Sequence, residues 1–394
     1  MSVQANSLAA KKNVTEQCVQ ARLNLFSLRI DRACKQAMAI LKAAGGSAAE
    51  AVVHAVTILE DDPATNAGYG SNLTLEGSVE CDASYMDDTC YGSVGAVSGI
   101  RNPIKAAHRL AQNRKKPMAL GRVPPMLLVG EGARRWAVSE GLETVPPEKL
   151  ISPEAFATYV NHMQLLDECR QDTVGAICVD AQGNVAAGVS SGGISLKLPG
   201  RVGEAAMYGT GCWAQNATSM MPGVACSTSG TGEQIMQTTI TSKLVQNICT
   251  CEDIYEAVTE TLQKQFLDSP MLRNADEKSV GVIMLKLEDA SEHLEFWYAH
   301  VTESMGIGWM ADGWSKPKLD GTAGKLVMVF LCKGYHDVLL SLPKDWLLEL
   351  SEIDTLPARY CLDVPVATNY CIIEYDVCIA PELLECSEML QSTD

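Results

Sequence analysis

The sequence predicts a mixed fold of α-helices and β-strands, of the α/β or α+β class, from two kinds of pattern. Residues 173–179 form an apolar run that is typical of a buried strand. A turn at 181–183 leads into a second apolar run at 184–189, so the two runs predict a β-hairpin. Apolar residues recur at helical spacing over 30–41, and a capping box at 47–50 opens the next helix.

The other elements are expected from the same periodicities. In chain order they are a loop rich in Gly and Asn at 63–72, a strand at 92–100, a helix at 103–111, a short strand at 127–129, a helix at 133–140, helices at 234–245 and 252–266, and strands at 280–287 and 293–300. Prolines and polar residues at 141–172 predict an exposed linker. Residues 1–28 show no clear periodicity, and residues 326–394 form an apolar, Cys-rich tail to which no element is assigned.

Composition restricts the class of protein. Hydrophobic residues make up 47% of the chain, and no stretch predicts a membrane span or a signal peptide. We therefore expect an intracellular protein, cytoplasmic or nuclear, whose 15 cysteines are mostly reduced. No Cys-x-x-Cys pair predicts a metal site, and no cofactor is expected. The net charge of −17 argues against direct binding of nucleic acid.

Thr173 stands at the head of the first predicted strand of the hairpin, directly after Asp172. Cleavage of the bond between them would give Thr173 a free α-amino group. That amine could serve as general base for the threonine hydroxyl, which is one form of nucleophilic catalysis. Its reference pKa of about 7.7–8.0 lies close to working pH, so no histidine is needed. An ordinary strand start is the alternative interpretation of the same residues.

Hydroxyl and glycine residues follow the returning strand and favour catalysis at Thr173. The hairpin brings 190–193 (SSGG) back beside Thr173, and a second cluster, STSGTGE, lies at 227–233. Glycines and hydroxyls after strands let backbone N–H groups approach a ligand closely. Arg201 adds a planar donor fork that fits a carboxylate.

Several segments together resemble one known family. They are NAGYGSNL at 66–73, ECDAS at 80–84, RVPP at 122–125, VGEGA at 129–133, the strand after Thr173, GCWA at 211–214 and TESM at 302–305. On these segments the chain resembles the N-terminal-nucleophile hydrolases of the plant-type asparaginase and aspartylglucosaminidase group, and within it most of all the threonine aspartases. The resemblance covers the chain from about residue 31 to about residue 322. It implies a four-layer αββα sandwich.

The resemblance also implies a role for each candidate catalytic residue. Thr173 would be the nucleophile, with Ser191 as a second hydroxyl beside it. Ser229 through its hydroxyl and Gly230 through its N–H would stabilise the oxyanion. Asn66 would lie near the threonine and assist self-cleavage. A role in loops and turns alone is the alternative interpretation of Asn66 and Ser191.

Three further residues are implied to bind the substrate. Arg201 would hold a carboxylate, Gly232 would contact the substrate through its backbone, and Glu204 stands where asparaginases have an acid for the substrate's α-amine. In an asparaginase the arginine holds the α-carboxylate, and the side-chain amide is cut. In a threonine aspartase it holds an aspartate side chain, and the following peptide bond is cut. Glu204 favours the first chemistry, whereas the RVPP, GCWA and TESM segments favour the second.

We therefore expect a threonine endopeptidase that cuts itself between Asp172 and Thr173 and then cuts protein substrates after an exposed aspartate. Residues 1–172 would form one subunit, and the second would begin at Thr173 and comprise 173–325 and the divergent tail 326–394. The resemblance implies transcription regulators as substrates. It also implies a homodimer of precursors or an αβ heterotetramer, without contact to nucleic acid or membrane.

Two alternatives stay open. The first is an L-asparaginase or isoaspartyl peptidase that acts on small substrates. The second is a binding protein that does not process itself, because members of the family open with a strand and a His-x-Gly-Ala-Gly-like turn, and no such segment precedes Asp31.

Overall fold

The computed structural model describes residues 28–165, 173–251, 253–288, 293–302, 304–323, 327–331, 338–341 and 370–376. Asp172, residues 1–27 and most of the tail 326–394 lie outside the described residues. The order of elements confirms a mixed fold of helices and strands arranged around two sheets. In the described part of the chain, no helix combines the length and the apolar character needed to cross a membrane.

Among the described residues, the larger sheet has eight strands, and all neighbouring strands are antiparallel except β2 and β3. From edge to edge it contains β11 (Lys318–Ala323), β10 (Ser304–Ala311), β14 (Tyr370–Asp376), β4 (Val174–Val179), β5 (Val185–Ser191), β1 (Cys81–Asp87), β2 (Tyr91–Val97) and β3 (Leu127–Val129). The predicted hairpin is confirmed as β4 and β5, with Val174 opposite Ser190 and Val179 opposite Val185.

The smaller sheet has six strands in the part of the chain that the structure describes, all paired antiparallel. It contains β13 (Val338–Ser341), β12 (Val327–Leu331), β9 (His293–His300), β8 (Val280–Glu288), β7 (Gly223–Gly230) and β6 (Cys212–Gln215). Strand β7 packs against β4 and β5 of the larger sheet.

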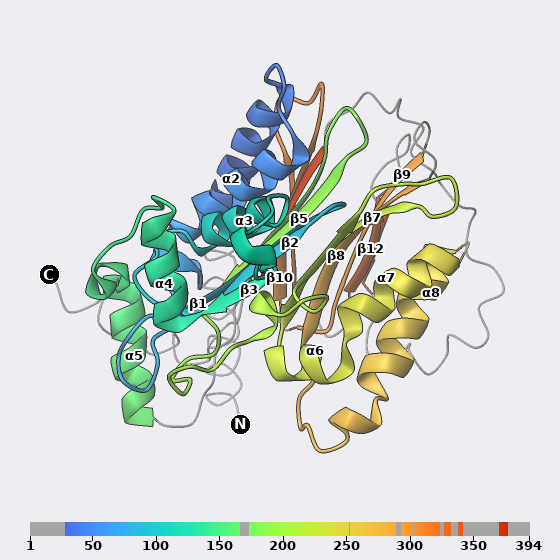
Figure 1. Ribbon diagram of the computed structural model, residues 1–394. Helices are drawn as coiled ribbons and strands as arrows, with labels where there is room; N and C mark the ends of the chain where they lie inside the picture. The colour runs from blue at the N-terminus through green and yellow to red at the C-terminus, as the bar shows by residue number, and fades with distance from the viewer. Residues whose placement is uncertain are drawn as a thin grey trace, which may run out of the picture.

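Helices cover the outer face of each sheet, as Figure 1 shows. On the larger sheet lie α2 (Ala48–Glu60), α3 (Pro103–Arg114) and α4 (Gly130–Ser139); on the smaller sheet lie α6 (Gly232–Thr238), α7 (Ile240–Thr250) and α8 (Ile254–Glu260). Three apolar clusters fill the space between successive layers, the middle one between the two sheets. The layers therefore run helix, sheet, sheet, helix.

Local signals explain the helices that the sequence predicts well. Ser47 caps α2, because its side chain accepts a hydrogen bond from the backbone N–H of Glu50. Asp253 caps α8 in the same way through Tyr255 and Glu256. The helix expected at 234–245 is instead divided into α6 and α7 at Thr239, which adopts a left-handed backbone with φ of 50°. The local sequence does not predict this break, since the sequence around Thr239 contains neither Gly nor Pro.

The linker expected at 141–172 is corrected by the structure. Its described part contains a short 3₁₀ turn at Pro147–Leu150 and the helix α5 (Pro153–Leu165). Most α5 side chains are exposed, but His162 is buried and its Nδ1 lies 2.6 Å from the Ser195 hydroxyl. This contact attaches α5 to the loop after β5, which is why the segment does not behave as a plain linker.

The tail contributes a strand that the sequence does not reveal. Strand β14 lies between β10 and β4 in the middle of the larger sheet, and its residues Cys371, Ile372 and Ile373 are buried. It pairs with β4 over its length, from Tyr370 opposite Val179 to Tyr375 opposite Val174. A segment from the far end of the chain thus supports the strand that begins after Thr173.

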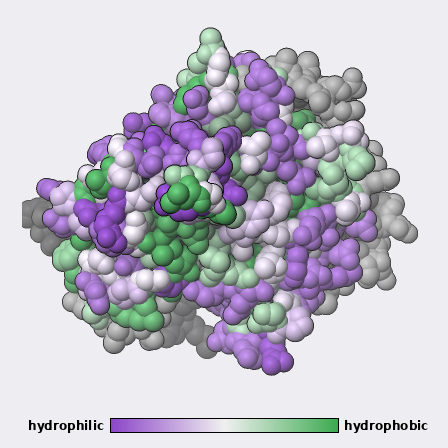
Figure 2. Space-filling view, viewed as in Figure 1, coloured by the Kyte–Doolittle hydropathy of each residue, from purple (hydrophilic) through white to green (hydrophobic). Residues whose placement is uncertain are grey.

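Apolar side chains reach the surface at several places in the view of Figure 2, and one group of them lies near the labelled positions of α3 and β3 in Figure 1. Leu120 and Val123, in the segment between α3 and β3, are exposed to 97% and 82%. Strand β3 forms one edge of the larger sheet.

Candidate active site

The hairpin places the hydroxyl of Thr173 inside the molecule. Thr173 precedes β4 directly and is only 3% exposed. Its Oγ1 donates to Oε1 of Glu204 over 3.2 Å and lies 3.3 Å from Oγ of Ser191. Ser191, the last residue of β5, also accepts a hydrogen bond from the backbone N–H of Gly193. In the structure, the predicted nucleophile therefore contacts both its predicted second hydroxyl and a carboxylate.

Asn66 supports the loop that follows Ser191. Its Nδ2 donates to the carbonyl of Gly193 over 2.9 Å, and its own carbonyl accepts from the N–H of Gly192 over 2.7 Å. Its Oδ1 accepts from the N–H of Asn72. Asn66 is thus placed next to the site, where it holds the two glycines in position.

Ser229 and Gly230 form the end of β7. The Ser229 hydroxyl is buried and has no hydrogen-bond partner among the described residues, so it is free to donate to a ligand. Gly230 has a φ of +125°, and an added Cβ would come within 2.4 Å of the Ser279 carbonyl. Only glycine fits there. Both residues have the chemistry expected of oxyanion donors.

Gly232 links the end of β7 to the residues that contact Thr173. A Cβ at this position would lie 2.3 Å from Oε2 of Glu204 and 2.8 Å from Nη2 of Arg201. Its backbone thus lies against both predicted substrate-binding side chains. Gly193 and Gly203 are equally close to the arginine, since a Cβ at either would lie 2.8 Å from Nη1. The backbone at these three glycines therefore approaches the guanidinium more closely than a residue with a Cβ would allow.

Glu233 holds Arg201 from one side. Nε and Nη2 of Arg201 donate to the two carboxylate oxygens of Glu233 over 2.8 and 2.6 Å. Nη1 of Arg201 donates to none of the described residues. The arginine side chain is 13% exposed and the Glu233 side chain 47%. A bidentate pair of this kind fixes the plane of the guanidinium and leaves its Nη1 end for a second carboxylate.

Asp82 fixes the loop that carries Arg201 and Glu204. Its buried carboxylate accepts hydrogen bonds from the N–H groups of Gly203 and Ala96, each over 2.8 Å. Because Ala96 belongs to β2, this carboxylate connects the loop to the larger sheet. ECDAS, in which Asp82 lies, is among the segments that resemble the family, but the sequence alone gives this residue no role.

Buried carboxyl groups near the hairpin have raised pKa values, among them Asp82, Glu204 and Glu60. Burial raises the pKa of Glu204 to about 7, although the positive charge of Arg201 opposes the shift. Burial also raises the pKa of Glu60 to about 8. Glu60 Oε1 accepts hydrogen bonds from the Ser190 hydroxyl over 2.7 Å and from the N–H of Ile104. Glu60 thus contacts the residue that directly precedes Ser191.

The contacts made by Glu233, Asp82 and Glu60 were missed by the sequence analysis. A glutamate directly after the Gly-Thr-Gly run is the one local signal for Glu233. No local signal of this kind exists for Glu60, whose sequence context is that of an ordinary helix residue. Among the described residues, no group of three or more His, Cys, Asp or Glu side chains could hold a metal ion.

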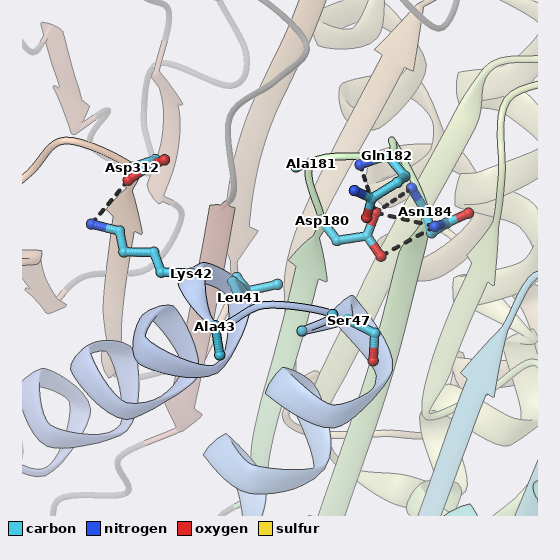
Figure 3. A pocket seen from close by; sticks show the side chains of 11 residues that line it. Leu41, Lys42, Ala43, Ser47, Asp180, Ala181, Gln182, Asn184 and Asp312 are labelled. Carbon is cyan, nitrogen blue, oxygen red and sulfur yellow. Dashed lines mark hydrogen bonds and ion pairs between the residues drawn. The ribbon is translucent and has the colours of Figure 1, made fainter.

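A surface cavity of about 530 Å³ lies at the other end of the hairpin. Figure 3 shows Asp180 and Asn184 of the hairpin turn on one side and the ion pair between Lys42 and Asp312 on the other. The Asp180 carboxylate accepts hydrogen bonds from the backbone N–H groups of Ala48, Gln182 and Asn184. The hairpin turn and the start of α2 therefore supply the hydrogen-bond donors of this carboxylate. Asp180 and Thr173 flank opposite ends of β4, and the cavity is therefore separate from the candidate active site.

Comparison with known proteins shows the family of the chain. A family model described as "Asparaginase" matches residues 8–289, more than half of the chain. Isoaspartyl peptidase/L-asparaginase of Rattus norvegicus is 37% identical over 250 residues, which are 61% of this chain and 70% of that protein. The mouse protein of the same name is 40% identical over 225 residues, 55% of this chain and 64% of that protein.

A bacterial relative shows the same similarity. Isoaspartyl peptidase of Salmonella typhimurium strain LT2 is 39% identical over 209 residues, which are 50% of this chain and 62% of that protein. The chain therefore spans roughly two thirds of the length of these curated relatives.

Proposed function

The chain belongs to the asparaginase family of N-terminal-nucleophile threonine hydrolases, and on this premise we propose that it is an isoaspartyl peptidase and L-asparaginase. It would release itself from an inactive precursor by cutting before Thr173. It would then hydrolyse the side-chain amide of small substrates that carry a free α-carboxylate and a free α-amine. The four-layer arrangement would be the sandwich typical of these hydrolases.

The observation that carries the proposal is the contact of Glu204 with Thr173 beside Arg201. A carboxylate and a guanidinium that flank one nucleophile suit a zwitterion. Arg201 would bind the α-carboxylate through its Nη1 end, and Glu204 would bind the α-ammonium. The substrate's side-chain carbonyl would then extend toward Thr173.

The chemistry follows from the residues in place. After self-cleavage, the α-amine of Thr173 takes the proton of its own Oγ1, which attacks the substrate carbonyl. Negative charge develops on the carbonyl oxygen, where the Ser229 hydroxyl and the Gly230 N–H would donate. The bond from the carbonyl carbon to the amide nitrogen then breaks, and the amine leaves with the proton that the α-amine took from Oγ1. Water hydrolyses the resulting ester, which releases the substrate's side-chain carboxylate and regenerates the threonine. Ser191 would hold Oγ1 in place through the 3.3 Å contact.

The sequence favours the threonine endopeptidase, but two findings favour the small-substrate alternative. The curated relatives are named isoaspartyl peptidase or isoaspartyl peptidase/L-asparaginase. The carboxylate of Glu204 is buried in the position that an extended peptide chain would have to pass. A buried charge without an ammonium partner is costly, so a neutral backbone fits this position poorly.

Competitive assays on the processed protein test the proposal. We expect hydrolysis of a β-aspartyl dipeptide and of free asparagine, and little cleavage of an extended peptide with an internal aspartate. Efficient cleavage of the extended peptide, without activity on the two small substrates, would establish the endopeptidase instead. Absence of both activities in a chain that stays uncut would favour the binding protein.

A further inference from the structure

Self-cleavage needs a base that the mature enzyme does not need. In the mature enzyme the free α-amine of Thr173 takes the proton from Oγ1. In the precursor the same nitrogen belongs to the peptide bond with Asp172, and an amide nitrogen does not accept a proton at neutral pH. The base for the first step must therefore be another group within reach of Oγ1.

Only two side chains make hydrogen bonds to the Thr173 hydroxyl in the described part of the chain. These are Ser191, at 3.3 Å, and Glu204, at 3.2 Å. A serine hydroxyl is too weak a base to remove a proton at neutral pH. The carboxylate of Glu204 is the acceptor of the bond from Oγ1 and lies within the distance that proton transfer requires.

We propose that Glu204 is the general base of self-cleavage, taking the proton of Thr173 Oγ1 before it ever meets a substrate ammonium. This inference rests on the self-cleavage in the proposed function. Oγ1 attacks the carbonyl carbon of Asp172, and the bond from that carbon to the Thr173 nitrogen breaks. The nitrogen receives the proton held by Glu204. Water then hydrolyses the ester, which leaves the Asp172 carboxylate and the free Thr173 hydroxyl.

The surroundings of Glu204 suit this role. Its backbone is held by two bonds to its carbonyl, from the Thr210 hydroxyl over 2.9 Å and from the Met207 N–H over 3.0 Å. The preceding Gly203 N–H is bound by Asp82. The backbone that carries the Glu204 side chain is therefore fixed beside Thr173. The absence of a side chain at Gly232 leaves the second oxygen, Oε2, accessible to a partner.

The protonation of Glu204 also fits. Burial raises its pKa to about 7, while Arg201 opposes the shift and the charge of Asp82 adds to it. Near neutral pH a large fraction is ionised and able to accept a proton, and the ionised form is more basic than an ordinary carboxylate. Once the α-amine is free, this base is no longer required, and Glu204 becomes available to the substrate.

The test follows the conversion of freshly made precursor. Radiolabelled chains are produced in a short cell-free pulse, and the appearance of fragments is timed on denaturing gels for the parent, Glu204→Gln, Glu204→Asp and Glu277→Gln. Glu277 is an exposed residue beside α6 whose backbone carbonyl accepts from Gln234, so its variant controls for the loss of one negative charge. Thr173→Ala provides the uncut reference.

We expect Glu204→Gln to slow conversion by about a hundredfold or more, since general-base catalysis contributes about 10²–10⁴-fold. Glu204→Asp should recover part of the rate, and Glu277→Gln should leave it unchanged. The parent rate should rise with pH through about 7, and the rise should be absent in Glu204→Gln. A thermal unfolding curve for Glu204→Gln like that of Thr173→Ala shows that the slow variant is folded.

The outcomes separate this inference from the function that it rests on. Conversion of Glu204→Gln within about threefold of the parent rate would overturn the base role and leave self-cleavage intact. A Glu204→Asp chain as slow as Glu204→Gln, with both folded, would also contradict it. A parent that stays uncut, or a Thr173→Ala chain that is cut, would overturn the proposed self-cleavage and the inference with it.

Discussion

Glu233 holds one edge of the Arg201 guanidinium, and in the proposed function the other edge binds the substrate carboxylate. Glu233 occupies Nε and Nη2, and the geometry leaves Nη1 directed toward Gly193 and Gly203. A lysine at 201 would keep the charge but could not contact two carboxylates in fixed directions. Binding of a substrate carboxylate at Arg201 should therefore depend on the shape of the guanidinium as well as on its charge.

Arg201→Lys should lower kcat/KM for a β-aspartyl dipeptide by about 10–100-fold, since a charge-assisted hydrogen bond is worth about 1.5–3 kcal/mol. Steady-state kinetics on the processed protein measure the change. Arg135→Lys, at an exposed position of α4, is the matched control. If Arg201→Lys kept the parent kcat/KM, the carboxylate would be bound elsewhere.

Glu60 predicts a pH dependence of stability. Its ordinary pKa of 4.5 is raised by burial to about 8 in the folded chain. Between these pH values the folded state keeps a proton that the unfolded state has released. Stability should therefore decrease as pH rises from about 5 to about 8, by at most about 1.4 kcal/mol per pH unit for this group. Glu204 adds to the decrease up to about pH 7.

Glu60→Gln should weaken this dependence, because the amide oxygen can still accept from Ser190 and Ile104 but does not titrate. Urea unfolding at pH 5 and pH 8, in a Thr173→Ala background that keeps one species, measures it. Glu277→Gln serves again as the exposed control. An equal slope in the Glu60→Gln chain and its parent would show that Glu60 titrates normally.

At the scale of elements, β14 is the strand whose loss should matter most. It supplies the partner of both β10 and β4, and β4 carries Thr173 at its head. Ile372 pairs with Ile177 on one side and Trp309 on the other and is 2% exposed. A proline there removes a ladder hydrogen bond in the middle of a sheet.

Ile372→Pro should therefore abolish cooperative unfolding and conversion of the precursor. Ile372→Val, which keeps the backbone, should cost only about 0.5–1.5 kcal/mol and leave conversion in place. Thermal unfolding and the denaturing gel measure both. Normal conversion and normal unfolding in Ile372→Pro would show that β4 does not depend on the tail.

Elements with local signals could be predicted, and those formed by distant pairing could not. The cap at Ser47 and the turn at 181–183 are formed by residues that are adjacent in the sequence. These local signals predict α2 and the hairpin β4–β5, which the structure contains. Strand β14 is recognised only by its partners in β4 and β10, far away in the sequence. Propensity over seven residues cannot identify such pairing.

The same distinction applies to the site. Thr173 and Ser191 could be placed together because one hairpin joins them. The pairing of Glu233 with Arg201 spans 32 residues and the strands β6 and β7, so no sequence spacing indicates it. Glu204 was identified as an acid beside the arginine, but its contact with the nucleophile required the folded chain. The choice between endopeptidase and small-substrate chemistry depended on that contact.

At the scale of the whole molecule, the candidate site lies where the two sheets meet. Thr173 directly precedes β4 of the larger sheet and Ser191 ends β5 of the same sheet. Ser229 and Gly230 belong to the smaller sheet, and Arg201 and Glu204 to the connection between β5 and β6. The catalytic groups would therefore share one geometry only while the sheets stay packed. The expected assembly into a dimer of precursors or an αβ heterotetramer stays a prediction.

The cut before Thr173 is the central claim, and one measurement tests it directly. Purified full-length protein is incubated at pH 8, separated on a denaturing gel, and each band is sequenced from its N-terminus. We predict two fragments, the smaller one corresponding to 1–172 and the larger one beginning Thr-Val-Gly-Ala, and a single full-length band for Thr173→Ala. A parent that remains one band, or a larger fragment that begins at any other residue, would contradict the account.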